Sequence, residues 1–235
     1  MQPYVDYTLL KPDATIADYE KLCLSALRNN DMVRAVCVLP DPVVMDFCRR
    51  LLGSSFYRLD NNVVADLMVK VCVVNDFPLG RSGYNVREIS ARLAKSYGVQ
   101  EIDTVLNAGL LLDKNYKEIS LELAVVTNIF PDATKVIIET GHPWHNEYLI
   151  KKATELVAES GAFCVKTSTG FIANIPIQQK VQHVKWMHEA APGLVIKVAG
   201  GVKTMADAEL FFDVVPRELL IFGASADFWK KKAEK

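Results

Sequence analysis

Two lysines interrupt apolar, strand-like segments of the chain, where a charged side chain is unexpected. Lys166 lies in the segment 163–170, and Lys197 lies in the segment 195–201. Burying an ammonium group without a partner is costly, although a single such lysine often extends its charged end to the rim of a sheet. Each segment also ends in glycine, which permits a tight turn. Two lysines in the same setting indicate a shared pocket.

Paired lysines in a partly buried pocket can support catalysis by an amine nucleophile. A free lysine has a pKa near 10.4, so only about one side chain in a few thousand is unprotonated at pH 7. Lowering this pKa by roughly three, at a cost of about 4 kcal/mol, makes the amine substantially neutral. Partial desolvation and a neighbouring cation can supply that change, and this is one route to lysines that form Schiff bases.

Asp103 is a third candidate, because the segment Glu101–Asn107 places it on one face of another predicted strand. A carboxylate beside the lysines can move a proton or orient a water molecule. The alternative interpretation is a structural ion pair between Asp103 and one lysine, which is the more common explanation for an isolated pair. The second strand lysine and the adjoining glycines favour a catalytic role for Asp103.

Glycines follow three consecutive predicted strands, at Gly170, at Gly200-Gly201 and at Gly223. Glycine allows backbone amides to approach a ligand closely, and the loops after strands seven and eight of α/β barrels often bind phosphate. A single glycine at such a place is normally a turn residue. Glycines in register after three strands predict a phosphate-binding site, here called the phosphate cup.

Strand-like and helical segments alternate along the whole chain. The predicted strands are Val5–Leu10, Met32–Leu39, Val69–Asn75, Glu101–Asn107, Lys135–Glu139, the segments around Lys166 and Lys197, and Leu219–Phe222. They are almost continuously apolar, which is typical of parallel strands buried on both faces. The pattern predicts an α/β fold, a single (β/α)8 TIM barrel over residues 1–235, with its chemistry at the C-terminal ends of the strands. A doubly wound open sheet is the alternative, but the glycine-rich dinucleotide or P-loop fingerprint usual there is missing.

Several helix ends are also marked in the sequence. Three helices have predicted N-caps, at Thr15, Asp41 and Thr204. Asn85 and Glu88 form a predicted capping pair for a helix that extends to Tyr97. A brief C-terminal helix is predicted after the segment Gly223–Ala226.

The composition fits one large globular domain and argues against two classes of partner. The chain has 235 residues, a formal net charge of −1 and 50% hydrophobic residues. A near-neutral chain without a basic block lacks the electrostatic footprint of a nucleic-acid-binding protein. Its longest apolar runs, such as Val71–Val74, are too short to cross a bilayer, and its first residues do not resemble a signal peptide. We therefore expect neither nucleic-acid nor membrane partners.

Cysteine and histidine usage predicts a cytoplasmic protein without a metal ion. The five cysteines are odd in number, lack CxxC spacing and lie mostly in apolar segments, so we expect reduced core thiols. His142 and His145 lie in one loop, while His183 and His188 lie on different faces of one helix. A catalytic zinc usually needs three protein ligands, so the histidines are predicted to have no metal role.

Segments spread along nearly the whole chain resemble 2-deoxyribose-5-phosphate aldolases. They are Asp6–Thr15, Asp76–Gly80, Glu101–Asp103, Lys135–Gly141, Val165–Phe171 and Lys197–Thr204. The combination of Lys-Thr-Ser-Thr-Gly with Lys-x-Ala-Gly-Gly is highly specific. Members of this family are metal-free class I aldolases with a (β/α)8 barrel and no cofactor. They reversibly cleave 2-deoxy-D-ribose 5-phosphate to D-glyceraldehyde 3-phosphate and acetaldehyde.

The resemblance implies a role for each candidate residue. Lys166 corresponds to the lysine that forms the Schiff base, and Lys197 to the neighbour that lowers its pKa. Asp103 corresponds to the proton-relay acid, which Asp6 supports. The remaining positions would hold the substrate phosphate: Gly170, Gly200, Gly201, Gly223 and Ser225. The implied partners are a phosphosugar and acetaldehyde, and the sequence is compatible with a homo-oligomer, either a dimer or a tetramer.

The chain departs from the family at two places. Tyr7 stands where members often have histidine, and Gly223-Ala-Ser225-Ala226 stands where they commonly have two serines after the glycine. The missing hydroxyl predicts a weaker preference for phosphorylated substrate, unless a backbone amide or water fills the gap. Two other functions stay open: a Schiff-base lyase of a different aldehyde or ketose, and a non-catalytic phosphosugar-binding barrel.

Overall fold

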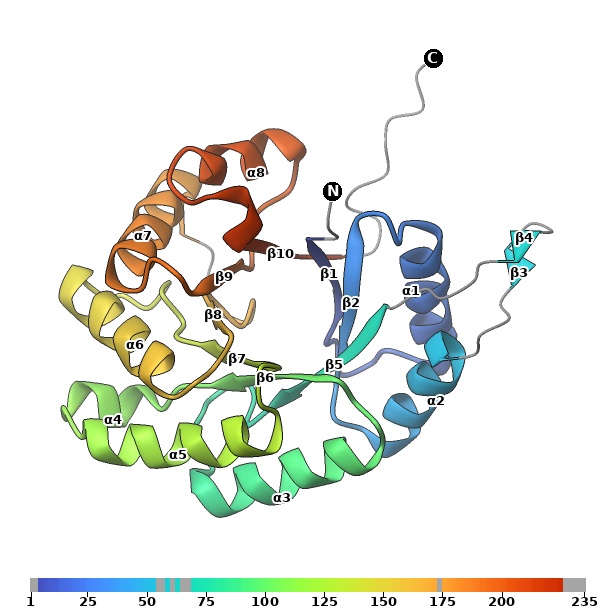
Figure 1. The fold of residues 1–235 in the computed structure, drawn as a ribbon, viewed down its shortest axis with the longest axis horizontal. Coiled ribbons are helices and arrows are strands. Elements are labelled where there is room, and N and C mark those ends of the chain that lie inside the picture. Colours follow the sequence, from blue (N-terminus) through green and yellow to red (C-terminus); the bar gives the residue numbers. More distant parts are fainter. Residues whose placement is uncertain (1–3, 54–57, 60–61, 64–68, 173–174, 226–235) are drawn as a thin grey trace.

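The computed structural model describes residues 4–53, 58–59, 62–63, 69–172 and 175–225. Parallel strands close into a barrel in the order β1-β10-β9-β8-β7-β6-β5-β2 (Figure 1). The barrel strands are β1 (Val5–Leu9), β2 (Val33–Val38), β5 (Lys70–Asn75), β6 (Glu101–Val105), β7 (Thr134–Ile137), β8 (Cys164–Lys166), β9 (Val195–Val198) and β10 (Leu220–Ala224). A separate antiparallel pair consists of β3 (Arg58–Leu59) and β4 (Asn62–Val63).

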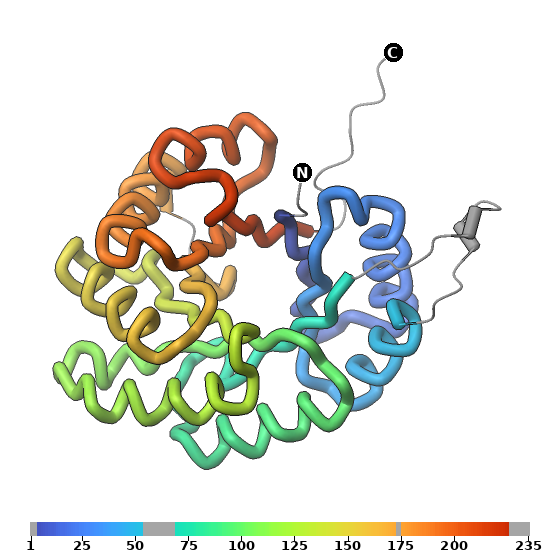
Figure 2. The backbone as a smooth tube through the Cα atoms, viewed as in Figure 1, coloured from blue at the N-terminus to red at the C-terminus, as the bar shows by residue number. Residues whose placement is uncertain are grey.

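Helices alternate with the barrel strands and form a ring outside them, as the backbone trace shows (Figure 2). They are α1 (Ile16–Arg28), α2 (Pro42–Gly53), α3 (Gly83–Ser96), α4 (Ala108–Leu112), α5 (Tyr116–Ile129), α6 (Glu147–Glu159), α7 (Ile177–Ala190) and α8 (Met205–Phe212). A short 3-10 helix, Arg217–Leu219, precedes β10. The closed parallel barrel with its outer helices confirms the predicted (β/α)8 fold.

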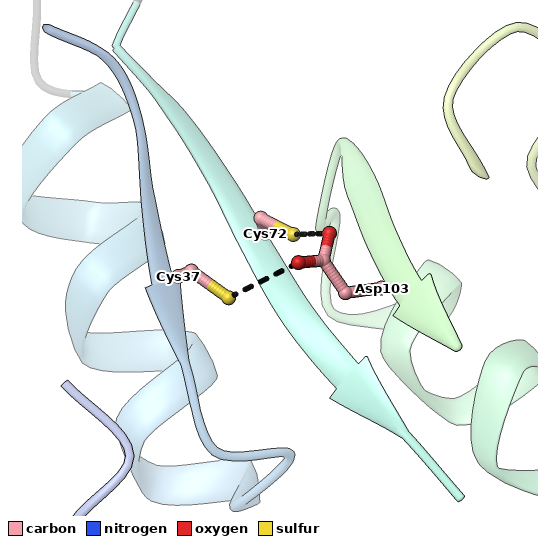
Figure 3. Close-up of side chains that lie close together, drawn as sticks. All are labelled: Cys37, Cys72 and Asp103. Atoms are coloured by element: carbon pink, nitrogen blue, oxygen red, sulfur yellow. Dashed lines mark hydrogen bonds between the residues drawn. The ribbon is translucent and has the colours of Figure 1, made fainter. Parts of the chain in front are cut away.

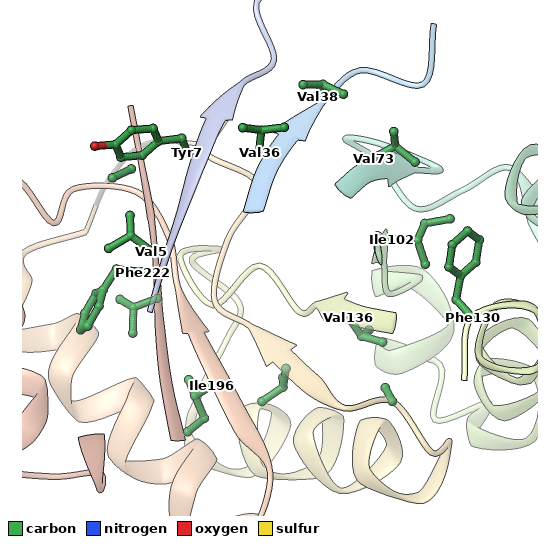
Figure 4. Packing of buried hydrophobic residues seen from close by; sticks show 14 of the residues in the cluster. Val5, Tyr7, Val36, Val38, Val73, Ile102, Phe130, Val136, Ile196 and Phe222 are labelled. Atoms are coloured by element: carbon green, nitrogen blue, oxygen red, sulfur yellow. The ribbon is translucent and has the colours of Figure 1, made fainter. Parts of the chain in front are cut away.

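Apolar side chains fill the layer between the barrel and the helices (Figure 4). Val36, Val73, Ile102 and Val136 lie on neighbouring strands and belong to one buried cluster that also contains Phe130, the residue directly after α5. Fully burying an aliphatic side chain contributes about 1.5–3 kcal/mol. Successive side chains of a strand point to opposite faces, so the sequence neighbours of these apolar residues point into the barrel. The apolar layer therefore stabilises the barrel, whose interior contains polar side chains.

The predicted N-caps at Thr15, Asp41 and Thr204 are confirmed. Thr15 and Asp18 form a capping box at α1, and Thr204 forms another with Asp207 at α8. The Asp41 carboxylate accepts a hydrogen bond from the first turn of α2 at 2.7 Å. Each cap satisfies backbone donors that have no partner within the helix.

The predicted capping pair of Asn85 and Glu88 is wrong, because α3 already begins at Gly83. The Asp76 carboxylate accepts hydrogen bonds from the Ser82 backbone N–H at 3.0 Å and from the Ser82 hydroxyl at 2.6 Å. These bonds hold Ser82, the residue directly before the helix, in place. Asn85 therefore lies inside the first turn, and the start of α3 is set by a contact with the preceding loop.

Two further differences concern segment ends. Strand β6 ends at Val105 instead of Asn107, because the Asn107 side chain accepts a hydrogen bond from the N–H of Leu110 and caps α4, a helix that was not predicted. The predicted C-terminal helix and Ala226 lie outside the described residues. Across the described ranges, every helix is too short or too polar to cross a membrane.

Candidate active site

Lys166 and Lys197 lie side by side inside the barrel. Lys166 is the last residue of β8 and pairs in register with Lys197 on β9. Asp103 lies on β6 and pairs in register with Lys135 on β7. The exposed fraction is 2% for Lys166 and 0% for Lys197 and Asp103. The barrel thus brings together the three residues that the sequence singled out, although they come from three different strands.

One carboxylate links the two predicted lysines. Oδ2 of Asp103 lies 2.8 Å from Nζ of Lys166 and 2.9 Å from Nζ of Lys197. Nζ of Lys197 also lies 2.6 Å from Oδ2 of Asp6, so Asp6 adjoins the pair as the sequence suggested. Burial lowers the pKa of Lys197, but Asp103 and Asp6 raise it above its ordinary value. Lys197 is therefore held in its charged form.

Lys135 is a third buried lysine of this cluster that was not among the predicted site residues. Its Nζ lies 2.8 Å from Oδ1 of Asp103, 2.7 Å from Oε2 of Glu101 and 3.2 Å from Sγ of Cys72. Burial lowers the pKa of Lys135, but its anionic neighbours, Asp103 foremost, raise it well above the ordinary value. Lys135 is the first residue of the predicted strand Lys135–Glu139, where a lysine usually reaches solvent, so the pattern did not set it apart as it did Lys166 and Lys197.

Arg34 enters the cluster through an irregularity in the barrel. The register between β1 and β2 shifts between Val5 and Asp6, which leaves Arg34 without a partner on β1. Such a bulge redirects a side chain. The Arg34 guanidinium lies 2.7 Å from Oδ1 of Asp6 and also contacts Glu101. No pattern in the sequence indicates a bulge here.

The cluster contains more positive than negative charge. Four cationic side chains in its interior, Arg34, Lys135, Lys166 and Lys197, face three carboxylates, Asp6, Glu101 and Asp103. Lys70 also contacts Glu101, but its side chain is 43% exposed, so it is not counted in the buried cluster. Burial raises the pKa of the Asp103 carboxyl, but the three neighbouring ammonium groups hold it well below its ordinary value. Burial also raises the pKa of Glu101, but the charges of Lys135 and Arg34 lower it further, to about 2. One proton can leave the cluster and bring its charges into balance.

A cavity of about 520 Å³ opens at the C-terminal ends of β8, β9, β10 and β1. Lys166 and Lys197 line it, whereas Asp103 and Asp6 lie behind them and are not lining residues. Every residue predicted for the phosphate cup also lines this cavity: Gly170, Gly200, Gly201, Gly223 and Ser225. The lysines and the glycines therefore face one common space.

The glycines give this cavity a backbone-lined wall. Gly170, Gly200 and Gly201 have φ angles of 86°, 71° and 78°, which glycine adopts without strain. A Cβ atom on Gly223 would lie 3.5 Å from Cε of Lys197, so the missing side chain leaves space beside that lysine. Without side chains, these glycines let a ligand approach the backbone of the loop closely.

Cys37, Cys72 and Asp103 form a group whose potential ligand atoms lie within 4.8 Å of one another (Figure 3). Sγ of Cys72 lies 3.0 Å from Oδ1 of Asp103, and Sγ of Cys37 lies 3.8 Å from Oδ2. Thiolates and carboxylates can ligate metals. The same carboxylate, however, already accepts hydrogen bonds from three ammonium groups, whose charge would repel a divalent cation. The group fits the ion cluster better than a metal site.

The histidines lie apart from the cavity. Nε2 of His145 lies 2.8 Å from the carbonyl oxygen of Ile138, and its ring packs on Trp144 with centroids 4.1 Å apart. Burial lowers the pKa of His145 to about 4. His183 stacks on Trp186 in α7. These contacts give both histidines a packing role.

Comparisons with known proteins identify relatives over nearly the whole chain. No model of a known protein family matches it. The deoxyribose-phosphate aldolase of Clostridium perfringens is 35% identical over 225 residues, which cover 94% of this chain and 90% of that protein. The deoxyribose-phosphate aldolase of Thermococcus kodakarensis is 37% identical over 209 residues, which cover 87% of this chain and 85% of that protein.

The fold agrees with these relatives. The solved tetrameric deoxyribose phosphate aldolase of Aeropyrum pernix matches with a TM-score of 0.75 and 25% identity, over 95% of this chain and 86% of that one. The sequence similarity extends over the same barrel that carries the lysine cluster and the cavity. The chain belongs to the deoxyribose-phosphate aldolase family.

Proposed function

We propose that the chain catalyses the reversible cleavage of 2-deoxy-D-ribose 5-phosphate to D-glyceraldehyde 3-phosphate and acetaldehyde, through a Schiff base on Lys166. The observation that carries this proposal is the position of Lys166 between a glycine-lined cavity and the buried Asp103, within a chain of this aldolase family. The site residues and their roles are part of the proposal.

Lys166 is the nucleophile of the mechanism. Its neutral amine attacks C1 of the open-chain sugar, and loss of water gives an iminium ion. The C2–C3 bond then breaks, and its electron pair moves toward the iminium nitrogen to form an enamine. The C3 hydroxyl loses its proton, so that D-glyceraldehyde 3-phosphate leaves as an aldehyde. Protonation of the enamine at C2 and hydrolysis of the resulting imine release acetaldehyde and restore the amine.

The contacts of the three buried lysines favour Lys166 over the other two. Lys197 contacts two carboxylates, and Lys135 contacts three carboxylates and a thiol. Among the described residues, Lys166 contacts a single carboxylate, that of Asp103. The cluster carries one excess positive charge, and a charged Lys197 disfavours a second cation beside it. Lys166 is therefore the buried lysine of the cluster with the fewest ionic partners, and it lines the cavity.

Asp103 is placed to relay protons. Its Oδ2 atom contacts both Lys166 and Lys197, so a proton can pass between the reacting amine and Lys197 through one carboxylate. Asp6 holds Lys197 from the other side at 2.6 Å. The charge of Asp103 also offsets the iminium charge that forms on Lys166.

The cavity suits a phosphorylated substrate. Its lining includes Lys11 and Lys203 in addition to Lys166 and Lys197, and no acidic residue is among the lining residues that the structure describes. The two further lysines add positive charge around Gly200 and the other cup glycines. A phosphate at the cup and an aldehyde at Lys166 would lie in the same cavity, as cleavage of a short phosphosugar requires.

The test is a coupled assay of D-glyceraldehyde 3-phosphate release from 2-deoxy-D-ribose 5-phosphate. Release of acetaldehyde, the product common to both sugars, compares this substrate with unphosphorylated 2-deoxyribose, whose other product is D-glyceraldehyde. We expect release from both sugars and faster release from the phosphate. Absence of release, together with a borohydride-trapped adduct from another aldehyde or ketose, would indicate a different Schiff-base lyase. Absence of any trapped adduct, with phosphosugar binding retained, would indicate a non-catalytic binding barrel.

Self-association is also part of the proposal. Val86, Ile89 and Leu93 are exposed and recur at helical spacing along α3, so they form an apolar stripe on the outside of the barrel. The relative from Aeropyrum pernix is described as tetrameric. We expect light scattering to show a dimer or tetramer, and Ile89→Glu to lower the mass if the stripe is the interface. An unchanged mass would place the interface elsewhere.

The remaining expectations concern the setting of the enzyme. We propose that residues 1–235 act as one catalytic domain in the cytoplasm, on small-molecule substrates only. The closure of β1 to β10 into one barrel supports a single catalytic unit. All five cysteines are buried and unpaired, which fits a reducing compartment.

A further inference from the structure

A fourth buried lysine lies outside the ion cluster and faces the back of the phosphate cup. Lys180 belongs to α7, and its side chain is only 3% exposed. Its Nζ donates a hydrogen bond to the carbonyl oxygen of Ala199 at 2.9 Å and another to the carbonyl oxygen of Gly200. Both acceptors belong to the loop after β9 that lines the cavity. An outer helix thus reaches this loop from the side opposite the ligand space.

These two hydrogen bonds determine which way the loop amides point. In a trans peptide unit, the C=O and N–H groups point in opposite directions. The carbonyls of Ala199 and Gly200 point toward Lys180, so the N–H groups of Gly200 and Gly201 point away from it, toward the cavity. Within the part of the chain that the structure describes, neither N–H has a hydrogen-bond partner. They are two donors free for a ligand.

Two hydroxyl groups of the loop after β8 also hold the Ala199 carbonyl in place. Ser168 donates to the oxygen of Ala199 at 2.6 Å, and Thr167 donates to it at 3.2 Å. Thr167 also accepts a hydrogen bond from the Ala199 N–H at 3.0 Å. The Gly200 carbonyl, in contrast, accepts its hydrogen bond from Lys180 within the described residues. Orientation of the second peptide unit, the one that carries the Gly201 N–H, therefore depends on Lys180.

We propose that Lys180 is a positioning residue of the phosphate cup, which orients the N–H groups of Gly200 and Gly201 toward the substrate phosphate and places a positive charge behind them. This inference rests on the proposed function. Hydrogen bonds from the ammonium group also polarise the two peptide units, which strengthens their N–H groups as donors. An apolar helix residue of similar length would fill the space but supply neither effect.

The surroundings of Lys180 support a functional reason for its burial. Burial lowers its pKa to about 8, and the charge of Glu139 offsets this change only in part. The Glu139 carboxylate accepts a hydrogen bond from the N–H of Thr169, so it is also tied to the loop after β8. His183, one turn further along α7, has a pKa lowered by burial and by Lys180. Keeping an ammonium group here is costly, and its bonds go to the cup.

The test compares Lys180→Met with Lys185→Met, which removes the same charge from an exposed position of the same helix. The first measurement is the affinity for inorganic phosphate by titration calorimetry, which needs no turnover. We expect Lys180→Met to weaken phosphate binding by about ten- to a hundredfold, the range expected for lost hydrogen bonds to a charged group. Lys185→Met should bind phosphate as the parent chain does.

The second measurement is steady-state kinetics with phosphorylated and plain 2-deoxyribose. We expect Lys180→Met to raise KM for the phosphosugar about tenfold or more while kcat/KM for the plain sugar changes less than about threefold. A parallel loss with both sugars would overturn the proposal and make Lys180 a structural residue. Unchanged phosphate affinity and unchanged KM would overturn it as well.

Lys180→Gln keeps a side-chain donor without the charge. If Lys180→Met does not fold, this second variant tests whether the charge of Lys180 contributes to phosphate binding. We expect phosphate affinity between those of the parent chain and Lys180→Met, and parental affinity in a folded Lys180→Gln would overturn the role of the charge.

The proposed reaction and the proposed role of Lys180 can fail independently of each other. A parent chain that binds phosphate but cleaves no deoxyribose 5-phosphate would refute the proposed reaction, while the calorimetric comparison would still test Lys180.

Discussion

Lys166 and Lys197 are register partners on β8 and β9, and their ammonium groups both donate to one oxygen atom, Oδ2 of Asp103, at 2.8 and 2.9 Å. Two cations that share an acceptor are held close together despite their repulsion. This pairing places the proposed nucleophile beside the proposed neighbouring cation, as the mechanism requires.

Replacing the nucleophile should abolish the covalent adduct without removing the charge. Arginine keeps a cation beside Asp103 but does not form a Schiff base, so Lys166→Arg should lower kcat by at least about a thousandfold. Intact mass after treatment with acetaldehyde and borohydride should show one adduct on the parent chain and none on the variant. Lys185→Arg, at an exposed position on α7, is the matched control and should keep the adduct. An adduct on Lys166→Arg would reassign the nucleophile.

Removing the neighbouring cation should change the pH dependence of the reaction. With Lys197→Met the cluster has three cations and three carboxylates, so a protonated amine at position 166 no longer carries an excess charge. A protonated amine cannot attack an aldehyde, and the acidic limb of the profile of kcat/KM against pH should therefore move to higher pH. We expect a displacement of roughly one pH unit or more, the usual scale for a nearby charge.

The matched control for Lys197→Met is Lys117→Met, an exposed lysine of α5. Its pH profile should coincide with that of the parent chain. If Lys197→Met lowers the rate but leaves the profile in place, then Lys197 binds substrate or transfers a proton and does not act through its charge.

The barrel was predictable because its signal repeats along the chain. Apolar strands that alternate with amphipathic helices leave few closed arrangements, and a lysine inside such a strand stands out from its neighbours. Lys135 escaped this rule, because it stands at the start of its strand and not within an apolar run. Their roles remain predictions, whereas their proximity is a property of the fold.

The parts that were not predicted depend on contacts between distant segments. Arg34 reaches Asp6 only because the register of β1 and β2 shifts. The start of α3 depends on a loop carboxylate, that of Asp76. Lys180 lies on a polar stretch of α7, and its neighbours in sequence do not reveal the loop that it contacts. Local patterns carry no information on such contacts.

Acid should destabilise the fold through His145. Burial lowers its pKa to about 4 in the folded chain, whereas an unfolded histidine has a pKa near 6.5. The folded state therefore resists protonation, and stability that is present above pH 6.5 is lost as the pH falls toward 4. The loss should be on the order of 2–3 kcal/mol. Urea unfolding of the parent chain and of His145→Phe at pH 7.5 and pH 4.5 measures it, and the variant should lose less on acidification. Equal losses would assign the acid sensitivity to other groups.

The central carboxylate should be needed for turnover more than for formation of the Schiff base. Asp103→Asn leaves Arg34 and the three buried lysines with two carboxylates, and it keeps the Lys166 amine, so borohydride trapping stays possible. The proton relay is lost, so kcat should fall by about a hundredfold or more, in the range of lost general acid–base catalysis. Because a buried carboxylate is removed from its ionic partners, the free energy of unfolding should also fall, by about 3–5 kcal/mol.

Glu101→Gln separates the relay from the charge count. It also removes one buried carboxylate, but Glu101 contacts Lys135, Arg34 and Lys70, and not Lys166. We expect Glu101→Gln to lose stability as Asp103→Asn does while it keeps most of its turnover. Equal losses of kcat in the two variants would show that net charge alone matters. Unimpaired turnover in Asp103→Asn would remove Asp103 from the mechanism, because the amide that replaces it has no acidic proton to relay at neutral pH.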